Sequence, residues 1–162
     1  MSAPSTAPAV QDFYPDDFAH CYGCGRLNRD GYHVRTHWEG DETVSRFTPR
    51  PYQMAVPGFV YGGLIASLID CHAMGTAAAA TLRAAGQDIG QTSSPRFVTA
   101  SLRVDFVKPT PLGPELVIRG RARETGARKV IVEATVSVGE TVTARGEAVA
   151  VRMPATMAAG VP

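Results

Sequence analysis

Apolar residues recur along the chain with two different periods. Between Gly62 and about Ala85 they fall at positions 64, 65, 68, 69 and 73, which is the spacing of one helical face, and alanines fill the second half of the segment. This pattern predicts one long helix that ends at Gly86. Because its residues are small and mostly apolar on all sides, we expect the helix to be enclosed by the rest of the fold.

Runs rich in β-branched and aromatic residues predict six strands. Two short runs, 33–40 and 42–49, flank Gly40-Asp41 and are typical of a hairpin. Four longer runs, 96–109, 115–125, 128–138 and 141–153, follow the helix, and the short connections between the last three favour antiparallel neighbours. The order predicts an α+β fold in which a curved antiparallel sheet packs around one long central helix.

The length of 162 residues fits a single domain. Residues 1–12 and 154–162 are rich in alanine and proline and offer little to bury, so we expect flexible tails on either side of a domain at 13–153. The 16 basic and 15 acidic residues nearly cancel, which argues against a nucleic-acid partner or an anionic membrane surface. The start of the chain lacks the pattern of a signal peptide, and no run approaches the length of a membrane span, so we expect a cytoplasmic protein.

The three cysteines do not form the pattern of a disulfide framework. Their number is odd, and Cys21 and Cys24 form a single CxxC motif. With His20 they would supply three metal ligands, but a structural zinc site usually has four, so we expect no metal and a buried or turn-forming pair. A zinc or redox role for Cys21 and Cys24 is the weaker alternative.

One acidic residue, Asp70, interrupts the apolar helix. Charged side chains are seldom buried without a partner, so Asp70 indicates a functional carboxylate; the alternative is a carboxylate satisfied by neighbouring hydroxyl or backbone groups. The helix begins at Gly62-Gly63, where unsatisfied N–H groups and the macrodipole can polarise a carbonyl oxygen. Asp70 can then act as a general base on water or as a nucleophile.

Gly62 and Asp70 are too far apart to act on the same carbonyl within one subunit. Eight residues of helix at a rise of 1.5 Å separate them by roughly 12 Å. We therefore expect a dimer with antiparallel helices, in which Gly62 of one subunit and Asp70 of the other flank one carbonyl group.

Three segments resemble a known family in their order and spacing: CYGCGRLNRDGYHVR, PGFVYGGLIASLID and VTASLRVDFVKPTPLG. They resemble the hotdog-fold acyl-CoA thioesterases, of the phenylacetate-pathway type and its human mitochondrial relatives, over about residues 18–152. The resemblance implies a homodimer, which can pair into a homotetramer, and hydrolysis of a medium-chain or aromatic acyl-CoA. It implies no cofactor, since coenzyme A is part of the substrate.

The resemblance also implies roles for single residues. In that family the helix opens with His-Gly-Gly, and an acidic residue stands eight positions after the first glycine, a spacing that Gly62 and Asp70 keep. This implies Asp70 as base or nucleophile, Gly62 as oxyanion donor, and Thr99, early in the strand that leads to the Pro-x-x-Gly turn, as the supporting hydroxyl. The alternative for Thr99 is an ordinary strand former.

The chain departs from the family at the entry to the helix. Tyr61 replaces the family histidine, and the usual upstream carboxamide has no counterpart in register, with Gln53 the nearest. A non-catalytic acyl-CoA-binding module is therefore the alternative function. A hydratase is disfavoured, because the only nearby histidine, His72, lies on another helical face than Asp70 and is expected in the core or an interface.

Arginines at 119, 121 and 123 share one face of a predicted strand. With two basic residues past the next turn they would clamp the phosphates of coenzyme A, and the alternative is a solvated strand face. The residues expected to bind substrate, at the helix start, in the acyl pocket or in this clamp, are Tyr61, Gly63, Gln53, Met74, Arg121, Arg123, Arg128 and Lys129.

Overall fold

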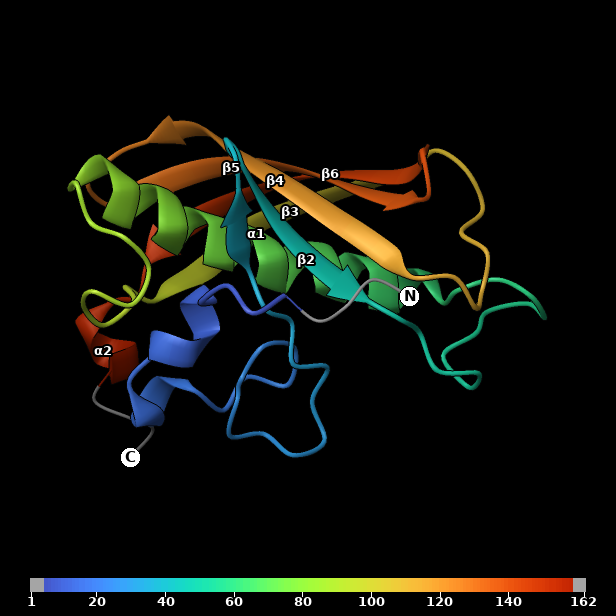
Figure 1. Ribbon diagram of the computed structural model, residues 1–162, viewed down its shortest axis with the longest axis horizontal. Helices are drawn as coiled ribbons and strands as arrows, with labels where there is room; N and C mark the ends of the chain where they lie inside the picture. The colour runs from blue at the N-terminus through green and yellow to red at the C-terminus, as the bar shows by residue number, and fades with distance from the viewer. Residues whose placement is uncertain (1–4, 159–162) are drawn as a thin grey trace.

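The computed structural model describes residues 5–158, and its centre is one long helix that a six-stranded antiparallel sheet wraps (Figure 1). In chain order the elements are η1 (Val10–Phe13), η2 (Asp16–Phe18), β1 (His37–Glu39), β2 (Glu42–Phe47), α1 (Gly62–Ala84), β3 (Phe97–Phe106), β4 (Leu116–Thr125), β5 (Lys129–Val138), β6 (Thr141–Arg152) and α2 (Ala155–Ala158). The strand order in the sheet is β1-β2-β4-β5-β6-β3. The α+β fold, the β1–β2 hairpin and the long helix predicted from the sequence are confirmed.

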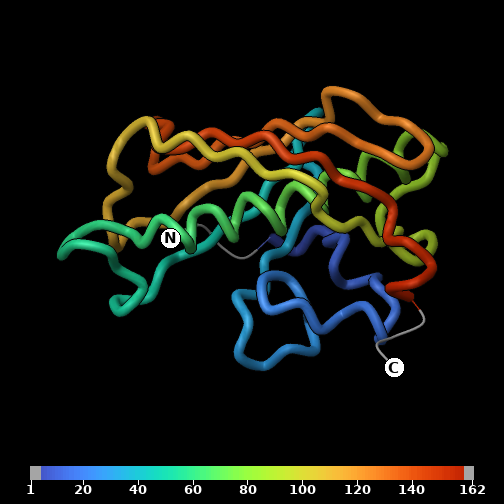
Figure 2. Tube along the Cα trace, turned by 180° about the vertical axis from the view of Figure 1, so that it is seen from behind, coloured from blue at the N-terminus to red at the C-terminus, as the bar shows by residue number. Residues whose placement is uncertain are grey.

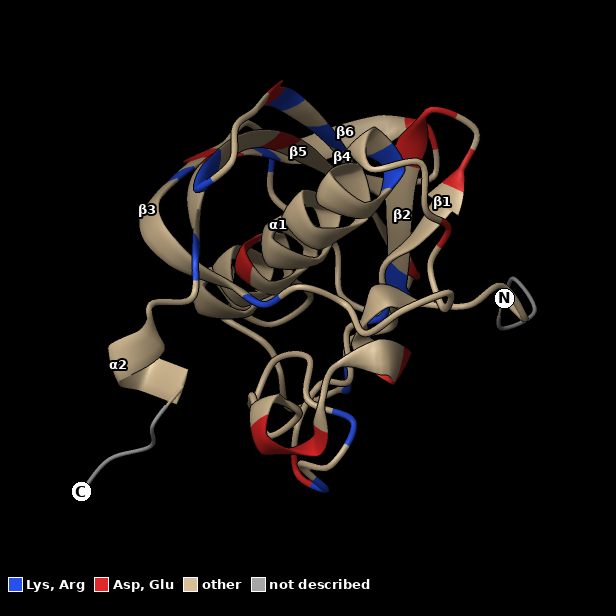
Figure 3. Ribbon diagram, turned by 90° about the vertical axis from the view of Figure 1, so that its left-hand side faces the viewer, with Lys and Arg blue, Asp and Glu red and all other residues tan. Residues whose placement is uncertain are grey.

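The concave face of the sheet lies close against α1. Alternate residues of the central strands, such as Val130, Val132 and Val136 of β5, point inward and are fully buried. At two positions even a methyl group would not fit: a Cβ at Gly146 would lie 2.6 Å from Ile69, and one at Gly120 would lie 2.7 Å from the Thr76 hydroxyl. The sheet therefore follows the surface of the helix, as the view from one end shows (Figure 3).

The buried face of α1 also carries a histidine among hydroxyl groups. His72 is fully buried, with Nδ1 2.7 Å from Ser45 Oγ and Nε2 3.2 Å from Thr43 Oγ1. The Thr43 hydroxyl in turn donates to the carbonyl of Gly120 and lies 2.7 Å from the Thr76 hydroxyl. Burial lowers the pKa of His72 to about 3, so the ring is neutral. The expectation of a core histidine is confirmed.

The N-terminal segment is packed more closely than the sequence indicates. Residues 1–12 were expected as a flexible tail, but Ala9 and Val10 are fully buried, and Gln11 exchanges hydrogen bonds with Thr36. Apolar residues in this segment are few, yet a single turn inserts them against the second half of α1. In the expected C-terminal tail, 154–162, Ala155–Ala158 form the short exposed helix α2. Residues 1–4 and 159–162 lie outside the described residues.

By length and composition, α1 could also cross a membrane. The expectation that no segment approaches a membrane span was therefore too strong, because the alanines of α1 lift its average hydropathy without long apolar side chains. Most of this helix is buried within the fold, and the sheet covers much of it.

We expect His72 to make stability depend on pH. Its folded-state pKa lies below the unfolded value of about 6.5, so the unfolded chain binds a proton that the folded chain does not. Stability is then present above about pH 6.5 and is lost as pH falls, by up to about 1.4 kcal/mol per pH unit. Urea unfolding between pH 7.5 and 5 should show a smaller loss in His72→Gln than in wild type.

Half-buried His37, whose pKa burial also lowers, is the matched control. Its replacement by glutamine should reduce the loss less than His72→Gln does. Equal pH dependence in wild type and His72→Gln would contradict the assignment.

Candidate functional site

Asp70 lies on the side of α1 that faces β3. The Thr99 hydroxyl of β3 donates a hydrogen bond to Asp70 Oδ1. Both residues line a cavity of about 190 Å³ together with Met74 and Arg96. The structure thus brings Asp70, Thr99 and Met74 together, as expected for a site at mid-helix. Asp70 is half-buried. Thr99 holds one of its carboxylate oxygens, and the cavity gives access to the carboxylate.

The start of α1 forms a second feature of the site. The carbonyl of Tyr61 accepts hydrogen bonds from the N–H groups of Leu64 and Ile65, at 3.1 and 3.3 Å. Gly62 and Gly63 are the first two helical residues, so their N–H groups have no acceptor within the helix. The Tyr61 ring folds over Gly63, where a Cβ would lie 2.5 Å from it. The donors predicted at Gly62-Gly63 are therefore present, with an aromatic ring beside them.

A cavity of about 320 Å³ opens at this helix start. Its wall includes Gly62 and Ile65 of α1, Phe59 of the preceding loop, and Phe106 at the end of β3. The Phe106 ring lies 3.5 Å from where a Cβ of Gly62 would stand. This cavity is mainly apolar, in contrast to the one beside Asp70.

The Asp70 half of the site and the half at the start of α1 do not meet within one chain. Thr99, near the start of β3, lies beside Asp70, whereas Phe106, at its end, lies beside Gly62. β3 is an edge strand: among the described residues it pairs with β6 alone, and it runs alongside α1 (Figure 2). Leu102 and Phe106 on this strand are exposed.

Gln53 acts through its backbone at the helix start. Its side chain accepts a hydrogen bond from the backbone N–H of Arg50 at 2.7 Å, within its own turn. Its carbonyl accepts from the N–H of Tyr61 at 3.1 Å, which ties the loop to the N-terminus of α1.

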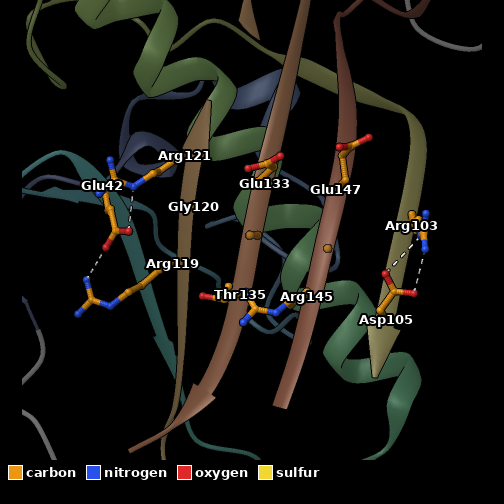
Figure 4. Close-up of a pocket in the computed structure, with 12 residues that line it drawn as sticks. Glu42, Arg103, Asp105, Arg119, Gly120, Arg121, Glu133, Thr135, Arg145 and Glu147 are labelled. Atoms are coloured by element: carbon orange, nitrogen blue, oxygen red, sulfur yellow. Dashed lines mark hydrogen bonds and ion pairs between the residues drawn. The ribbon is translucent and has the colours of Figure 1, made fainter. Parts of the chain in front are cut away.

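Arg119 and Arg121 of β4 lie on the face of the sheet turned away from α1 (Figure 4), and Arg123 pairs with carboxylates of neighbouring strands. The predicted common face is confirmed, but the guanidinium groups form ion pairs with carboxylates from other strands. Arg121 Nε lies 3.0 Å from Glu42, and Arg123 Nη1 lies 3.1 Å from Glu133 and 2.8 Å from Glu147. These acids border a shallow hollow of about 520 Å³ on the outer face, so Arg121 and Arg123 are not free cations.

Arg128 and Lys129 differ from the row, because neither takes part in an ion pair within residues 5–158. Arg128 lies in the turn between β4 and β5, and Lys129 is the first residue of β5.

Two residues at the site were not singled out from the sequence. Arg96 lines the Asp70 cavity, and its guanidinium lies 4.9 Å from the centre of the Tyr14 ring. Cys71 lines the same cavity and lies 3.8 Å, sulfur to sulfur, from Cys21. No spacing rule connects either residue to Asp70. The one feature of the sequence that could have pointed to this part of the site is that Cys71 directly follows Asp70.

The comparison with protein families is decisive for the class of the chain. The model described as the thioesterase superfamily matches residues 57–145, more than half of the chain. The chain belongs to the thioesterase superfamily. The matched segment contains the whole of α1 and β3, and therefore Gly62, Asp70 and Thr99.

Solved thioesterase superfamily structures share the fold. One from Shewanella loihica is 45% identical, with a TM-score of 0.66, over 86% of this chain and 98% of that chain. The PaaI protein of the E. coli phenylacetic acid degradation operon aligns with a TM-score of 0.57 at 14% identity, over 76% and 81%, and shows the fold alone. The hotdog fold implied by the resemblance is confirmed, whereas the phenylacetate-pathway type is not specifically indicated.

Among curated proteins, acyl-coenzyme A thioesterase THEM4 of Xenopus laevis is 36% identical over 87 residues, or 54% of this chain and 33% of that protein. THEM4 of Mus musculus is 33% identical over 94 residues, or 58% and 35%. The chain thus spans about a third of the length of these two THEM4 proteins.

Removing the Thr99 hydroxyl should impair the site without unfolding the chain. A hydrogen bond to a charged group contributes about 1.5–3 kcal/mol, so Thr99→Val should lower kcat for thioester hydrolysis by roughly 10-fold or more. Because Thr99 is exposed, the melting temperature of the Thr99→Val variant should differ little from that of wild type. Thr99→Ser keeps the donor and should retain most activity; equal loss in both variants would show that the hydroxyl is not what matters.

Proposed function

We propose that the chain is an acyl-CoA thioesterase that hydrolyses a medium-chain or aromatic acyl-CoA to the free acid and coenzyme A. The observation that carries this proposal is the Asp70 carboxylate, held by Thr99 at mid-helix inside the segment that matches the superfamily. The similarity to the two THEM4 proteins over 54–58% of the chain supports acyl-CoA as the substrate class.

Hydrolysis needs a water activated at the thioester carbon and a place for the negative charge that develops on the oxygen. Asp70 takes the proton of the attacking water, or attacks the carbon itself and is released by water in a second step. The Gly62 N–H, at the positive end of α1, donates a hydrogen bond to the carbonyl oxygen as negative charge develops on it. The carbon–sulfur bond then breaks, and coenzyme A leaves as a thiolate that takes up the proton.

We propose that the two halves meet across a homodimer. If β3 pairs antiparallel with the same strand of a second copy, so that Thr99 stands opposite the partner's Phe106, the partner's Gly62 comes next to Asp70. The free edge of β3 and its exposed apolar residues support this pairing. Further assembly into a tetramer stays a prediction.

Coenzyme A offers phosphates that a surface cation can bind. Arg128 and Lys129 are the members of the expected clamp that remain free of acidic partners within residues 5–158, so we assign the phosphates to them rather than to Arg121 and Arg123. The three free cysteines fit the reducing cytoplasm that we propose as the location.

A non-catalytic acyl-CoA-binding module is the second candidate, and one observation favours it. The Tyr61 ring lies against Gly63, where a carbonyl group would approach the helix start. The Tyr61 ring would have to move aside before the Gly62 N–H could reach the carbonyl of a substrate.

The primary test is release of free thiol from short, medium, long and aromatic acyl-CoAs. Wild type should release thiol, most rapidly with medium or aromatic chains, and Asp70→Asn should lower kcat by about 100-fold or more. Undiminished activity in Asp70→Asn would refute the role of the carboxylate. Binding of all esters without thiol release would establish the binding module instead.

The shared site predicts recovery of activity in mixed dimers. Proline is favoured at the first helical position, and the extended conformation of Tyr61 (ψ 127°) suits the residue before proline, so Gly62→Pro removes the N–H donor with little strain. Gly62→Ala keeps the donor and is the control. We expect Gly62→Pro to lose about 100-fold in kcat and Gly62→Ala to lose much less.

Co-expression with two tags can isolate dimers of one Asp70→Asn chain and one Gly62→Pro chain. One of their two sites combines intact Asp70 with intact Gly62, so they should show about half of wild-type activity. If both groups acted within one subunit, both sites would be defective and no activity would return.

A further inference from the structure

The three cysteines of the chain meet in one place behind Asp70. Cys21 and Cys24 come from the loop after η2, and Cys71 comes from α1, fifty residues further on. All three sulfur atoms lie within 4.8 Å of one another. Cys24 and Cys71 are buried and Cys21 is half-buried. The proposed hydrolysis does not use this cluster of three thiols, so we looked for a separate role for it.

The distances fit the coordination of a tetrahedral metal ion. A zinc–sulfur bond is about 2.3 Å, and two ligands of a regular tetrahedron with that bond length are about 3.8 Å apart. The Cys21 and Cys71 sulfurs are 3.8 Å apart without any ion between them. A disulfide would instead require about 2.05 Å, so two sulfurs would have to move much closer together.

The loop that carries Cys21 and Cys24 forms a tight turn against α1. The N–H of Gly25 donates to the carbonyl of Cys21 at 2.7 Å. A Cβ at position 23 would overlap the Cys71 sulfur, so the loop lies directly on α1 only because residue 23 is glycine.

The charge around the cluster also suits thiolates. Arg96 lines the same cavity as the three cysteines and brings a positive charge to it. A divalent ion on three thiolates carries one net negative charge, which the Arg96 guanidinium can balance.

We propose that Cys21, Cys24 and Cys71 bind a thiophilic divalent metal ion, with zinc as the best fit. Within residues 5–158 no other histidine, cysteine or carboxylate joins this group of ligands, so the fourth position faces the cavity that Asp70 and Thr99 also line. A water molecule there would complete the tetrahedron. Binding displaces the protons that the thiols hold and involves no oxidation. The ion fixes the loop to α1 one residue from Asp70.

The test is metal content. The protein should be purified under reducing conditions, loaded with Zn²⁺, passed into metal-free buffer and analysed by plasma mass spectrometry. We expect one zinc per chain in wild type and at least a tenfold lower content in Cys71→Ser. His20→Ala is the matched control, because His20 is exposed and adjoins the CxxC motif; it should keep the full zinc content.

Cobalt distinguishes three sulfur ligands from two. With Co²⁺ in place of zinc, wild type should show a sulfur-to-cobalt charge-transfer band in the near ultraviolet and tetrahedral bands in the visible. Cys21→Ser, which alters the most exposed of the three sulfurs, should weaken both while the circular dichroism spectrum confirms folding. These readouts do not depend on thioesterase activity, so the metal site and the enzymatic role can fail separately.

Several outcomes would overturn the proposal. Equal zinc in wild type and Cys71→Ser would remove Cys71 from the site. Wild type with three reduced thiols and no retained zinc would show that the cluster is only packing. An intramolecular disulfide that forms in place of zinc binding, visible as the loss of two hydrogens in intact mass, would assign the cluster to thiol redox chemistry.

Discussion

Close packing between α1 and the concave face of the sheet is the constraint on which the rest of the structure depends. Alanines dominate the second half of the helix, and Gly120 and Gly146 bring the strands against it. Such packing leaves the helix no freedom to rotate or slide, because a shift of one methyl group already produces overlap. The direction in which each helical side chain points is therefore fixed by the core, and the functional groups inherit that precision.

Three consecutive residues of α1 show what this precision achieves. Successive residues of a helix point about 100° apart. Asp70 therefore meets the hydroxyl of β3, Cys71 meets the cysteine loop, and His72 enters the hydroxyl network beneath β2 and β4. One turn of helix thus carries a hydrogen-bonded carboxylate, a member of the thiol cluster and a neutral buried ring, each in surroundings that suit its charge.

Much of the fold and the central part of the site could be predicted from the sequence. The helical and strand periods located every long element, and the isolated acid in an apolar helix marked Asp70, since burial of a lone charge needs a reason. Thr99 followed from the resemblance alone. These features depend on local patterns or fixed spacings, which a single sequence displays.

The remainder depends on contacts between segments that are distant in the chain. Cys71 joins Cys21 and Cys24 only because the loop lies on α1, and Arg96 reaches the same cavity from the start of the β3 segment. Glu42 and Glu147, which engage the β4 arginines, come from different strands, so the strand order had to be known first. The buried turn at Val10 was missed because its few apolar residues are surrounded by a sequence typical of a tail.

The sharing of one helical turn among three surroundings has a consequence for how this chain can diverge. Substitutions on α1 change one surrounding at a time, and many leave the other two intact. Insertion or deletion of one residue between Gly62 and Asp70 would turn the next three positions by about 100° and disrupt all three surroundings at once. The length of this segment should therefore vary far less during evolution than its composition, whereas the loop between Phe47 and Tyr61 can change length freely at its exposed tip.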